Sequence, residues 1–375
     1  MSDRTFIIAE AGVNHNGKPS TAFDLIDIAK QCGADAIKFQ LFSANNLVTQ
    51  YAVKADYQTK KEDNNKQFSM LNSLELPKKT YEDLREYCKI RNIDFLCTAF
   101  DSKNLNFLVD KLRLKTLKIA SGEITNAPLL LAHARTNCNL ILSTGMSNIK
   151  EIEEALEVIA FGYLYANKKP NKKDFKIVYN SLEGKKILNS KVTLLHCTTE
   201  YPAPNKDLNL KSIQSMKEYF DLKVGYSDHS KGINASLVAV YLGAKIIEKH
   251  FTIDKKWDGP DHKASLEPNE LKNLTSNIRS LDLMSFSKKK EFIDTIKNLE
   301  VMFGSGVKEP MESEIKNINI ARRYLVANEN IIIGEKFSKK NLTCKRSKKG
   351  ISPMLYWDYL GKSSKKDYAK EDIIL

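Results

Sequence analysis

Short apolar runs recur along the first 250 residues, and a stretch with helical periodicity follows each of them. The runs are four or five residues long and rich in β-branched residues, which is typical of buried strands. They are Thr5–Ile8, Ala36–Phe39, Asp94–Cys97, Thr116–Ile119, Leu140–Ser143, Val192–His196, Lys223–Tyr226 and Ile246–His250. The helical stretches include Ser20–Cys32, Pro77–Arg91, Lys150–Ala160 and Ile233–Leu242. This alternation of eight strands with helices predicts an α/β fold, a (β/α)8 TIM barrel over residues 1–284.

Three other segments depart from that alternation. Residues 161–191 are rich in Lys and Asn and lengthen the connection before the sixth strand, so we expect a surface insertion. Residues 285–315 begin with a Lys run and end in a polar stretch, which indicates a linker. Residues 316–375 hold short apolar runs and turns, which predict a small, mostly β domain. Its core would be modest, so we expect it to dock on the barrel or on another subunit.

Charge and cysteine content narrow the possible partners. The formal net charge of +13 favours an anionic partner, but Lys residues outnumber Arg and are scattered along the chain. Nucleic-acid readers concentrate Arg-rich charge on one face, so we expect a small anionic substrate and no nucleic acid. The six cysteines form no CxxC pair and indicate buried free thiols in a reducing compartment. Without a signal peptide or a long apolar run, we expect a cytoplasmic protein with no membrane span.

Two lysines lie inside apolar strands near their carboxyl ends, where barrel enzymes place their functional residues. A buried Lys requires an anionic partner, so Lys38 and Lys118 either pair with an internal carboxylate or clamp the phosphate or carboxylate of a ligand. Hydroxyl residues follow several strands and could complete a phosphate cradle with backbone N–H groups. These residues are Thr98, Ser121, Ser143 and Ser227.

Two histidines end the seventh and eighth strands, which are neighbours in a barrel. His229 and His250 could therefore hold one divalent ion, or one could act without metal while the other is structural. His15 and His196 could compete for that role, His262 in the loop after the eighth strand could belong to the site, and His133 on a helix is expected to be a surface or packing residue. The acidic candidates for handling protons or sugar hydroxyls are Glu10, Glu123, Asp228 and Asp261.

A family resemblance follows from motifs that occur in order along nearly the whole chain. AEAGVNHNG, GADAIKFQ, KIASGE, ILSTGM, LHCTTEYPAP, GYSDHS, IEKHFT and GPDHKASLEP resemble the bacterial sialic acid synthases. The C-terminal RYLVANENIIIGEKFSKKNLTCKR resembles their small antifreeze-like (SAF, β-clip) domain. The closest variants of the family are the N-acetylneuraminate and legionaminate synthases.

The resemblance implies a role for each matching residue. His229 and His250 would bind Mn²⁺, with Mg²⁺ or Co²⁺ as alternatives, and would share the catalytic role with Glu10 and Glu123. Residues implied to bind phosphoenolpyruvate are Lys38, Thr98, Lys118, Ser121, Ser143, Thr199 and Ser227. Those implied to contact the sugar are Gln40, Tyr201, Asp261 and Arg346. Arg346 would reach the sugar site of a second subunit, because the family forms a domain-swapped homodimer.

The implied reaction condenses phosphoenolpyruvate with N-acetylmannosamine, giving N-acetylneuraminate and phosphate by C–O cleavage. A legionaminate synthase that uses 2,4-diacetamido-2,4,6-trideoxymannose is the alternative. Two remoter alternatives stay open at this point. One is a barrel aldolase that forms a Schiff base on Lys38 or Lys118, and the other is a non-catalytic sugar-binding protein.

Overall fold

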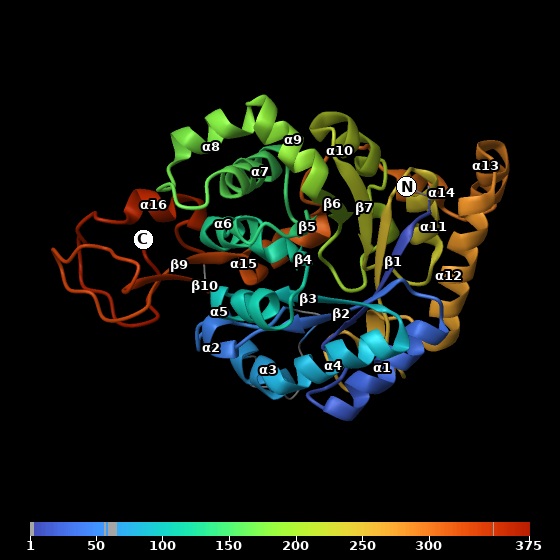
Figure 1. Ribbon diagram of the computed structural model, residues 1–375, viewed down its shortest axis with the longest axis horizontal. Coiled ribbons are helices and arrows are strands. Elements are labelled where there is room, and N and C mark those ends of the chain that lie inside the picture. Colours follow the sequence, from blue (N-terminus) through green and yellow to red (C-terminus); the bar gives the residue numbers. More distant parts are fainter. Residues whose placement is uncertain (1–3, 56–57, 59–65, 348) are drawn as a thin grey trace.

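Eight parallel strands close into a barrel in the computed structural model, which describes residues 4–55, 58, 66–347 and 349–375 (Figure 1). The strands pair in sequence order, and β1 also pairs with β8. They are β1 Phe6–Gly12, β2 Ala36–Leu41, β3 Asp94–Ala99, β4 Thr116–Ile119, β5 Asn139–Ser143, β6 Val192–Cys197, β7 Lys223–Asp228 and β8 Ile246–His250. The predicted (β/α)8 barrel is therefore confirmed, and several strands extend beyond the predicted carboxyl end.

A helix after each strand covers the outside of the barrel. These helices are α1 Pro19–Gln31, α4 Lys78–Arg91, α5 Ser102–Asn106, α6 Ala127–Arg135, α7 Ile149–Leu164, α10 Ser212–Phe220, α11 Asn234–Tyr241 and α12 Pro268–Leu283. Two short helices, α2 Ala44–Leu47 and α3 Gln67–Leu74, precede α4. The apolar positions of the barrel helices face the strands and form the main core, as their periodicity predicts.

The interior of the barrel has an apolar layer below a polar one. The apolar layer contains Ile8, Ala36, Leu96, Ile141 and Leu195. Side chains in a strand alternate between its two faces, so the residue two positions later points to the same interior. At four of these strands that later residue is polar: Glu10, Lys38, Thr98 and Ser143. The alternation thus stacks a polar layer on the apolar floor, toward the carboxyl ends of the strands.

The segment 161–191 is helical where we expected a surface insertion. It contains the end of α7, then α8 Lys172–Tyr179 and α9 Leu182–Lys191, which lie on the outside of α7 (Figure 1). Phe175 of α8 packs edge-on against Phe161 of α7, with ring centroids 5.0 Å apart. On its other side Phe175 packs against Trp357, at 5.3 Å. The segment therefore lies on the surface, as expected, and also contacts the C-terminal part of the chain.

The segment 285–315, which we expected to be a linker, is packed against the barrel. It contains α13 Phe286–Asp294 and α14 Leu299–Phe303, whose side chains Ile293 and Met302 are buried in the main core. The carbonyl of Met302 accepts the N–H of Leu210 at 2.9 Å. The reason for the difference is that apolar residues interrupt the polar sequence at positions that face the barrel. The domain boundaries at 284 and 315 stay predictions.

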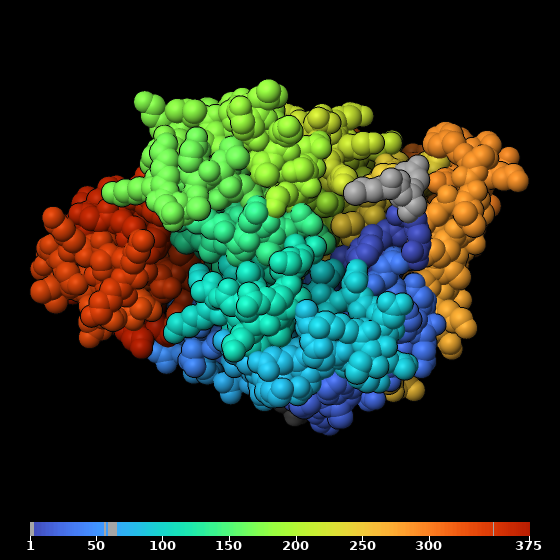
Figure 2. Space-filling view, in the orientation of Figure 1, coloured from blue at the N-terminus to red at the C-terminus, as the bar shows by residue number. Residues whose placement is uncertain are grey.

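The chain ends in a small β-containing part on one side of the barrel, opposite α13 (Figures 1 and 2). After α15 Ile315–Ala321, strand β9 Arg323–Ala327 pairs antiparallel with β10 Leu342–Arg346, and α16 Tyr356–Tyr359 follows. This part has its own apolar cluster: Leu325, Ala327, Ile331, Phe337, Leu342, Tyr356, Tyr368 and Ile374. Its docking on the barrel of the same chain agrees with the expectation from its modest core. The likeness to an antifreeze-like domain stays a prediction.

Two further expectations concern the cysteines and the membrane. All six cysteines are free thiols; five are buried and Cys344 is partly exposed. Burial raises the pKa of Cys88 to about 12, so this thiol stays protonated at neutral pH. Within the described residues, no helix has both the length and the apolar character that a membrane crossing requires.

Candidate active site

A cavity opens at the carboxyl ends of the barrel strands and collects nearly every residue that the sequence proposed. From the barrel it is lined by Glu10, Lys38, Gln40, Thr98, Lys118, Ser121, Ser143, Thr199, Tyr201, Ser227, His229, His250 and Asp261. Arg346 from β10 completes this set. Of the residues to which the resemblance gave a role in the site, Glu123 is the one missing from the lining; the acidic candidate Asp228 and the competing histidines are missing as well.

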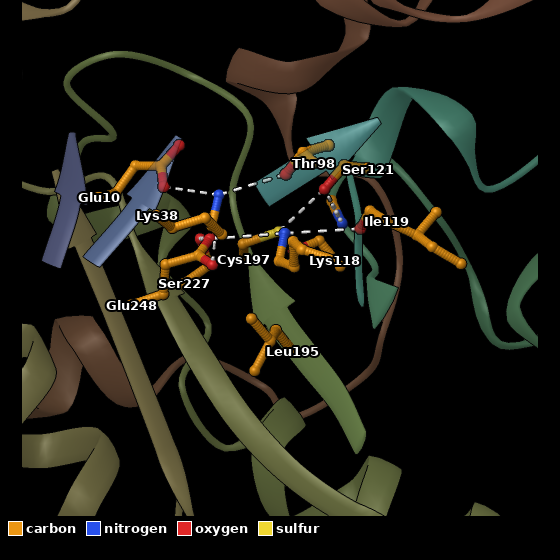
Figure 3. A network of polar contacts seen from close by, with 12 residues as sticks. Glu10, Lys38, Thr98, Lys118, Ile119, Ser121, Leu195, Cys197, Ser227 and Glu248 are labelled. Atoms are coloured by element: carbon orange, nitrogen blue, oxygen red, sulfur yellow. Dashed lines mark hydrogen bonds and ion pairs between the residues drawn. The ribbon is translucent and has the colours of Figure 1, made fainter. Parts of the chain in front are cut away.

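The two lysines lie inside a buried network of opposite charges (Figure 3). Lys38 Nζ is 2.6 Å from Glu10 Oε2 and 3.6 Å from Glu248 Oε2. Lys118 Nζ is 3.5 Å from Glu248 Oε1 and donates to Ser143 Oγ at 2.7 Å. Burial alone would lower the pKa of Lys38, but Glu10 and Glu248 outweigh it and raise that pKa. At least one charged ammonium group therefore faces the cavity.

Glu248 is a cavity residue to which the sequence analysis gave no role. It lies between the two lysines and accepts a hydrogen bond from Ser227 Oγ at 2.8 Å. Burial would raise the pKa of this carboxyl, yet Lys118 and Lys38 lower it to about 2. A signal was present in the strand, because Glu248 and His250 are two residues apart and share the inward face.

Hydroxyl groups and backbone gather beside Lys118. Ser121 Oγ accepts the N–H of Gly145 at 3.0 Å. A Cβ on Gly145 would lie 2.2 Å from Thr199 Oγ1 and 2.9 Å from Ser121 Oγ, so only glycine fits here. Thr199 Oγ1 is itself buried, with no hydrogen-bond partner among the described residues. A buried hydroxyl without a partner next to an ammonium group suits an anionic ligand.

The two strand-end histidines converge on the other side of the cavity. The ring centroids of His229 and His250 are 5.7 Å apart, and the ring of Tyr201 lies 4.2 Å from that of His229. His229 Nδ1 is 2.7 Å from the carbonyl oxygen of Thr198, a contact that requires the proton on Nδ1. This tautomer leaves the lone pair of Nε2 in the cavity, as in metal-binding histidines whose other nitrogen donates to a carbonyl.

His250 and Asp261 complete this side. His250 Nδ1 is buried without a hydrogen-bond partner and lies 3.8 Å from Asp261 Oδ2. Burial lowers the pKa of His229 to about 4, so its ring is neutral at pH 7. Within the described ranges, no set of three or more His, Cys, Asp or Glu is gathered for a metal. His229 Nε2 lies 3.2 Å from Tyr201 Oη and 3.4 Å from Ser227 Oγ, and the two imidazoles together fit a divalent cation whose other ligands come from substrate and water.

The remaining histidines are turned away from the cavity. In each of them one ring nitrogen forms a hydrogen bond with a nearby group. The pairs are His15 Nδ1 with Gly17 N, His133 Nδ1 with Leu129 O, His196 Nε2 with Leu208 O and His262 Nδ1 with Thr252 Oγ1. None of the four lines the cavity. Asp228 is also structural, because it pairs with the buried Lys249 at 3.0 Å on the outward face of its strand.

Glu123 is not in the cavity lining and its carboxylate contacts Arg323 and Asn126 instead, so its catalytic role stays a prediction. Its Oε1 is 2.8 Å from Arg323 Nε, and its Oε2 accepts from Asn126 Nδ2 at 2.7 Å. The chain leaves β4 in a 3₁₀ turn, Ser121–Glu123, and this turn directs Ser121 inward and Glu123 toward β9. Glu123 therefore joins the barrel to the C-terminal part.

Arg346 lines the cavity of its own chain, whereas the resemblance implied that it would serve a partner subunit. Its guanidinium lies 5.7 Å from the ring centroid of Phe100. Its carbonyl accepts the N–H of Thr49 at 3.0 Å, which ties β10 to the barrel loop after α2. In the single chain, Arg346 therefore lies at the cavity of its own barrel, and its contribution to a partner subunit stays a prediction.

The fold and the cavity define a class of protein: a (β/α)8-barrel enzyme with lysines and hydroxyls for an anion on one side and two imidazoles on the other. A family model described as the NeuB family matches residues 25–305. The chain is 47% identical over 372 residues to an N,N'-diacetyllegionaminic acid synthase of Campylobacter jejuni, covering 99% of both chains.

Two solved structures agree with this match. The spore coat polysaccharide biosynthesis protein spsE of Bacillus subtilis has a TM-score of 0.75 and 32% identity, over 99% of this chain and 94% of that one. An N-acetylneuraminic acid synthetase of Leptospira borgpetersenii has a TM-score of 0.59 and 34% identity, over 79% and 93%. The chain belongs to the NeuB family of synthases, which condense phosphoenolpyruvate with amino sugars and generally depend on a metal.

Proposed function

We propose that this enzyme condenses phosphoenolpyruvate with 2,4-diacetamido-2,4,6-trideoxymannose, giving N,N'-diacetyllegionaminate and phosphate. The cavity joins an anion-binding side to an apolar wall, and that wall is the observation that carries the choice of sugar. The 47% identity to a legionaminate synthase over the whole chain supports the same choice. N-acetylmannosamine, the first expectation from the sequence, becomes the alternative.

The apolar wall is formed by residues from the loops after the first four strands and from α2 and α3. It contains Val13, Phe42, Leu47, Met70, Leu71, Leu74, Phe100 and Ala120. The diacetamido sugar carries three methyl groups, two on its acetamido groups and one at carbon 6. N-acetylmannosamine has one methyl group and a hydroxyl at carbon 6. A hydroxyl placed against this wall would lose its water without a replacement partner, which favours the 6-deoxy sugar.

On the anion side, Lys38 and Lys118 hold phosphoenolpyruvate through its phosphate and carboxylate, with the hydroxyls of Ser143 and Thr199 beside them. Carbon 3 of phosphoenolpyruvate forms the new bond to the aldehyde carbon of the open-chain sugar. Water adds at carbon 2, and the bond from carbon 2 to the phosphate oxygen breaks to release phosphate. Glu10, whose pKa is raised by burial, is placed to accept a proton from that water.

On the metal side, His229 and His250 would hold a divalent ion, for which we take Mn²⁺ from the family resemblance because oxygen donors of substrate and water would complete its coordination. A bound ion would supply Lewis-acid polarisation of the aldehyde oxygen. Isothermal titration with Mn²⁺ tests this assignment without requiring turnover. His229→Ala and His250→Ala should lose Mn²⁺ binding while His262→Gln retains it. Wild-type affinity for Mn²⁺ in both Ala variants would remove the assignment.

The acceptor is tested by comparing kcat/KM for the two sugars with phosphoenolpyruvate and Mn²⁺. Apolar pockets discriminate against an added hydroxyl by at most about 100-fold, so we expect a roughly 10- to 100-fold preference for the diacetamido sugar. Met70→Gln, a near-isosteric polar change in the apolar wall, should reduce the ratio of kcat/KM for the diacetamido sugar to kcat/KM for N-acetylmannosamine. Met284→Gln, outside the cavity, should leave it unchanged. Equal or better use of N-acetylmannosamine by the wild type would overturn the proposal.

A Schiff-base aldolase on Lys38 finds little support in the charge network, whereas burial lowers the pKa of Lys118, so borohydride trapping remains the test for that lysine. The Lys38 amine is ion-paired with Glu10, and its raised pKa keeps it protonated and therefore a poor nucleophile. The homodimer and the cytoplasmic location stay predictions. A dimer mass in light scattering of the purified protein would support the first, and fluorescence of a tagged chain in cells would test the second.

A further inference from the structure

The segment after α14 contacts the two loops that follow β5 and β6. The carboxylate of Glu314 is 1% exposed and lies between those loops. Its Oε1 accepts two hydrogen bonds, from the backbone N–H of Met146 and from that of Thr199, both at 2.7 Å. Its Oε2 accepts the N–H of Met311, in its own segment, at 2.9 Å. One oxygen thus serves the two barrel loops, and the other serves the turn that carries Glu314.

The carbonyls of the same two residues are also bound by this segment. Arg322 donates from Nη2 to the carbonyl of Met146 at 2.6 Å. Asn317 donates from Nδ2 to the carbonyl of Thr199 at 2.7 Å. Both peptide polar groups of Met146 and of Thr199 are therefore satisfied from outside the barrel. Since buried backbone groups require partners, this segment fixes the conformation of both loops.

These two loops form the hydroxyl-lined side of the cavity, which contains Met146 and Thr199. Met146 has φ +59°, a left-handed conformation that is unfavourable for a residue with a side chain and needs support from its surroundings. The unpartnered Thr199 Oγ1 depends on the position of its own backbone, which Glu314 and Asn317 hold. Thr199 Oγ1 and Ser121 Oγ both lie close to Gly145, so a movement of either loop would change the arrangement of these hydroxyls.

We propose that Glu314 is a positioning residue for phosphoenolpyruvate. Through its hydrogen bonds to Met146 and Thr199, it aligns the two loops that bind the phosphate. It is not in the cavity lining and lies beyond residues 25–305, the part of the chain that the family model matches. The inference rests on the proposed function, because it requires the phosphate to lie against these loops. A positioning role predicts that loss of Glu314 weakens binding of the anion and leaves binding of the sugar unchanged.

The two carboxylate oxygens allow a sharp test. Glu314→Ala removes the acceptor for both loops. Glu314→Gln keeps one acceptor oxygen, and orienting it toward the loops satisfies two N–H groups, whereas orienting it toward Met311 satisfies one. If Glu314 acts by holding the two loops, the Gln variant should therefore bind phosphate nearly as well as the wild type. Glu312→Gln is the matched control, since Glu312 is exposed and pairs with the exposed Lys206 at 3.0 Å.

The measurements are the dissociation constant for inorganic phosphate by calorimetry and the KM values for phosphoenolpyruvate and the amino sugar, with Mn²⁺ present. For Glu314→Ala we expect about a tenfold rise in the phosphate dissociation constant and in KM for phosphoenolpyruvate, which corresponds to ~1.4 kcal/mol. KM for the sugar should stay within about twofold of the wild-type value, because the two loops face the anion and not the sugar. Glu314→Gln should lie near the wild type, and Glu312→Gln should match it.

Several results would overturn the inference: unchanged phosphate binding in Glu314→Ala, an equal rise in both KM values, or a Gln variant as impaired as the Ala variant. If Glu314→Ala fails to fold, Asn317→Ala replaces it, because this change frees the carbonyl of Thr199 and keeps Glu314. Unchanged phosphate binding there would also overturn the inference. A wild type that neither binds phosphate nor consumes phosphoenolpyruvate would refute the proposed function itself, a separate outcome.

Discussion

Replacement of Glu123 by Gln separates a structural carboxylate from a catalytic one. The ion pair between Glu123 and Arg323 is buried, with side-chain exposures of 0% and 2% and a separation of 2.8 Å. Breaking a buried pair costs about 3–5 kcal/mol, because one charge stays buried without its partner. Arg323 keeps hydrogen bonds to the carbonyls of Asn46 and Cys344, both at 3.0 Å, so we expect the lower end, ~3 kcal/mol.

The assay is the free energy of unfolding from urea titration, together with kcat/KM at a temperature where the variant is fully folded. With an unfolding entropy of about 2.1 cal/mol/K per residue over 375 residues, a loss of about 3 kcal/mol should lower the melting temperature by about 4 °C. Because the carboxylate faces Arg323 and not the cavity, kcat/KM should stay within about threefold of the wild type, as for a change outside the reacting groups. Glu10→Gln, inside the cavity, should lower kcat instead.

An exposed pair provides the control. Lys79 and Glu82 are 3.4 Å apart with exposures of 73% and 40%, so Glu82→Gln should change the free energy of unfolding by less than about 1 kcal/mol. A Glu123→Gln variant with wild-type stability and about a 100-fold loss of kcat would refute the reasoning. It would return Glu123 to the catalytic role that the sequence resemblance implied.

Three further predictions follow from the charge network and the buried histidines. Lys118→Met should lower kcat/KM for phosphoenolpyruvate by about 10- to 100-fold, while the exposed Lys115→Met should not; similar values for both variants would contradict the anion clamp. Glu248→Gln leaves two buried lysines with one carboxylate, so the free energy of unfolding should fall by about 3 kcal/mol. Phosphoenolpyruvate should then raise the melting temperature of the variant more than that of the wild type. An equal rise in melting temperature in both proteins would count against this network. Burial lowers the pKa of His133 to about 4, so its neutral form stabilises the fold above about pH 6.5 and this contribution is lost as pH falls toward 4. His133→Leu should therefore reduce the fall in unfolding free energy between pH 7 and pH 5 by about 2 kcal/mol, and parallel pH curves for the two proteins would exclude this origin.

Local pattern was sufficient for the barrel and for most of its cavity. Apolar runs of four or five residues set the strands, and the alternation of side chains placed Lys38 and Lys118 on the inward face. Neighbouring strand ends then brought His229 and His250 together, because parallel strands in a barrel share one carboxyl edge. The same alternation contained the signal for Glu248, two residues before His250, although no role was assigned to it.

Tertiary structure decided the residues that lie in loops or come from outside the barrel. Glu123 follows its strand within a turn, where side-chain direction has no fixed period, and Arg323 of β9 determines where it points. Glu314 lies in a segment whose polar sequence resembles a linker, and two of the backbone N–H groups that it binds, those of Met146 and Thr199, are more than 100 residues away. Sequence spacing reports the periodicity of one element, whereas these contacts depend on how separate elements dock, so they became visible only in the folded chain.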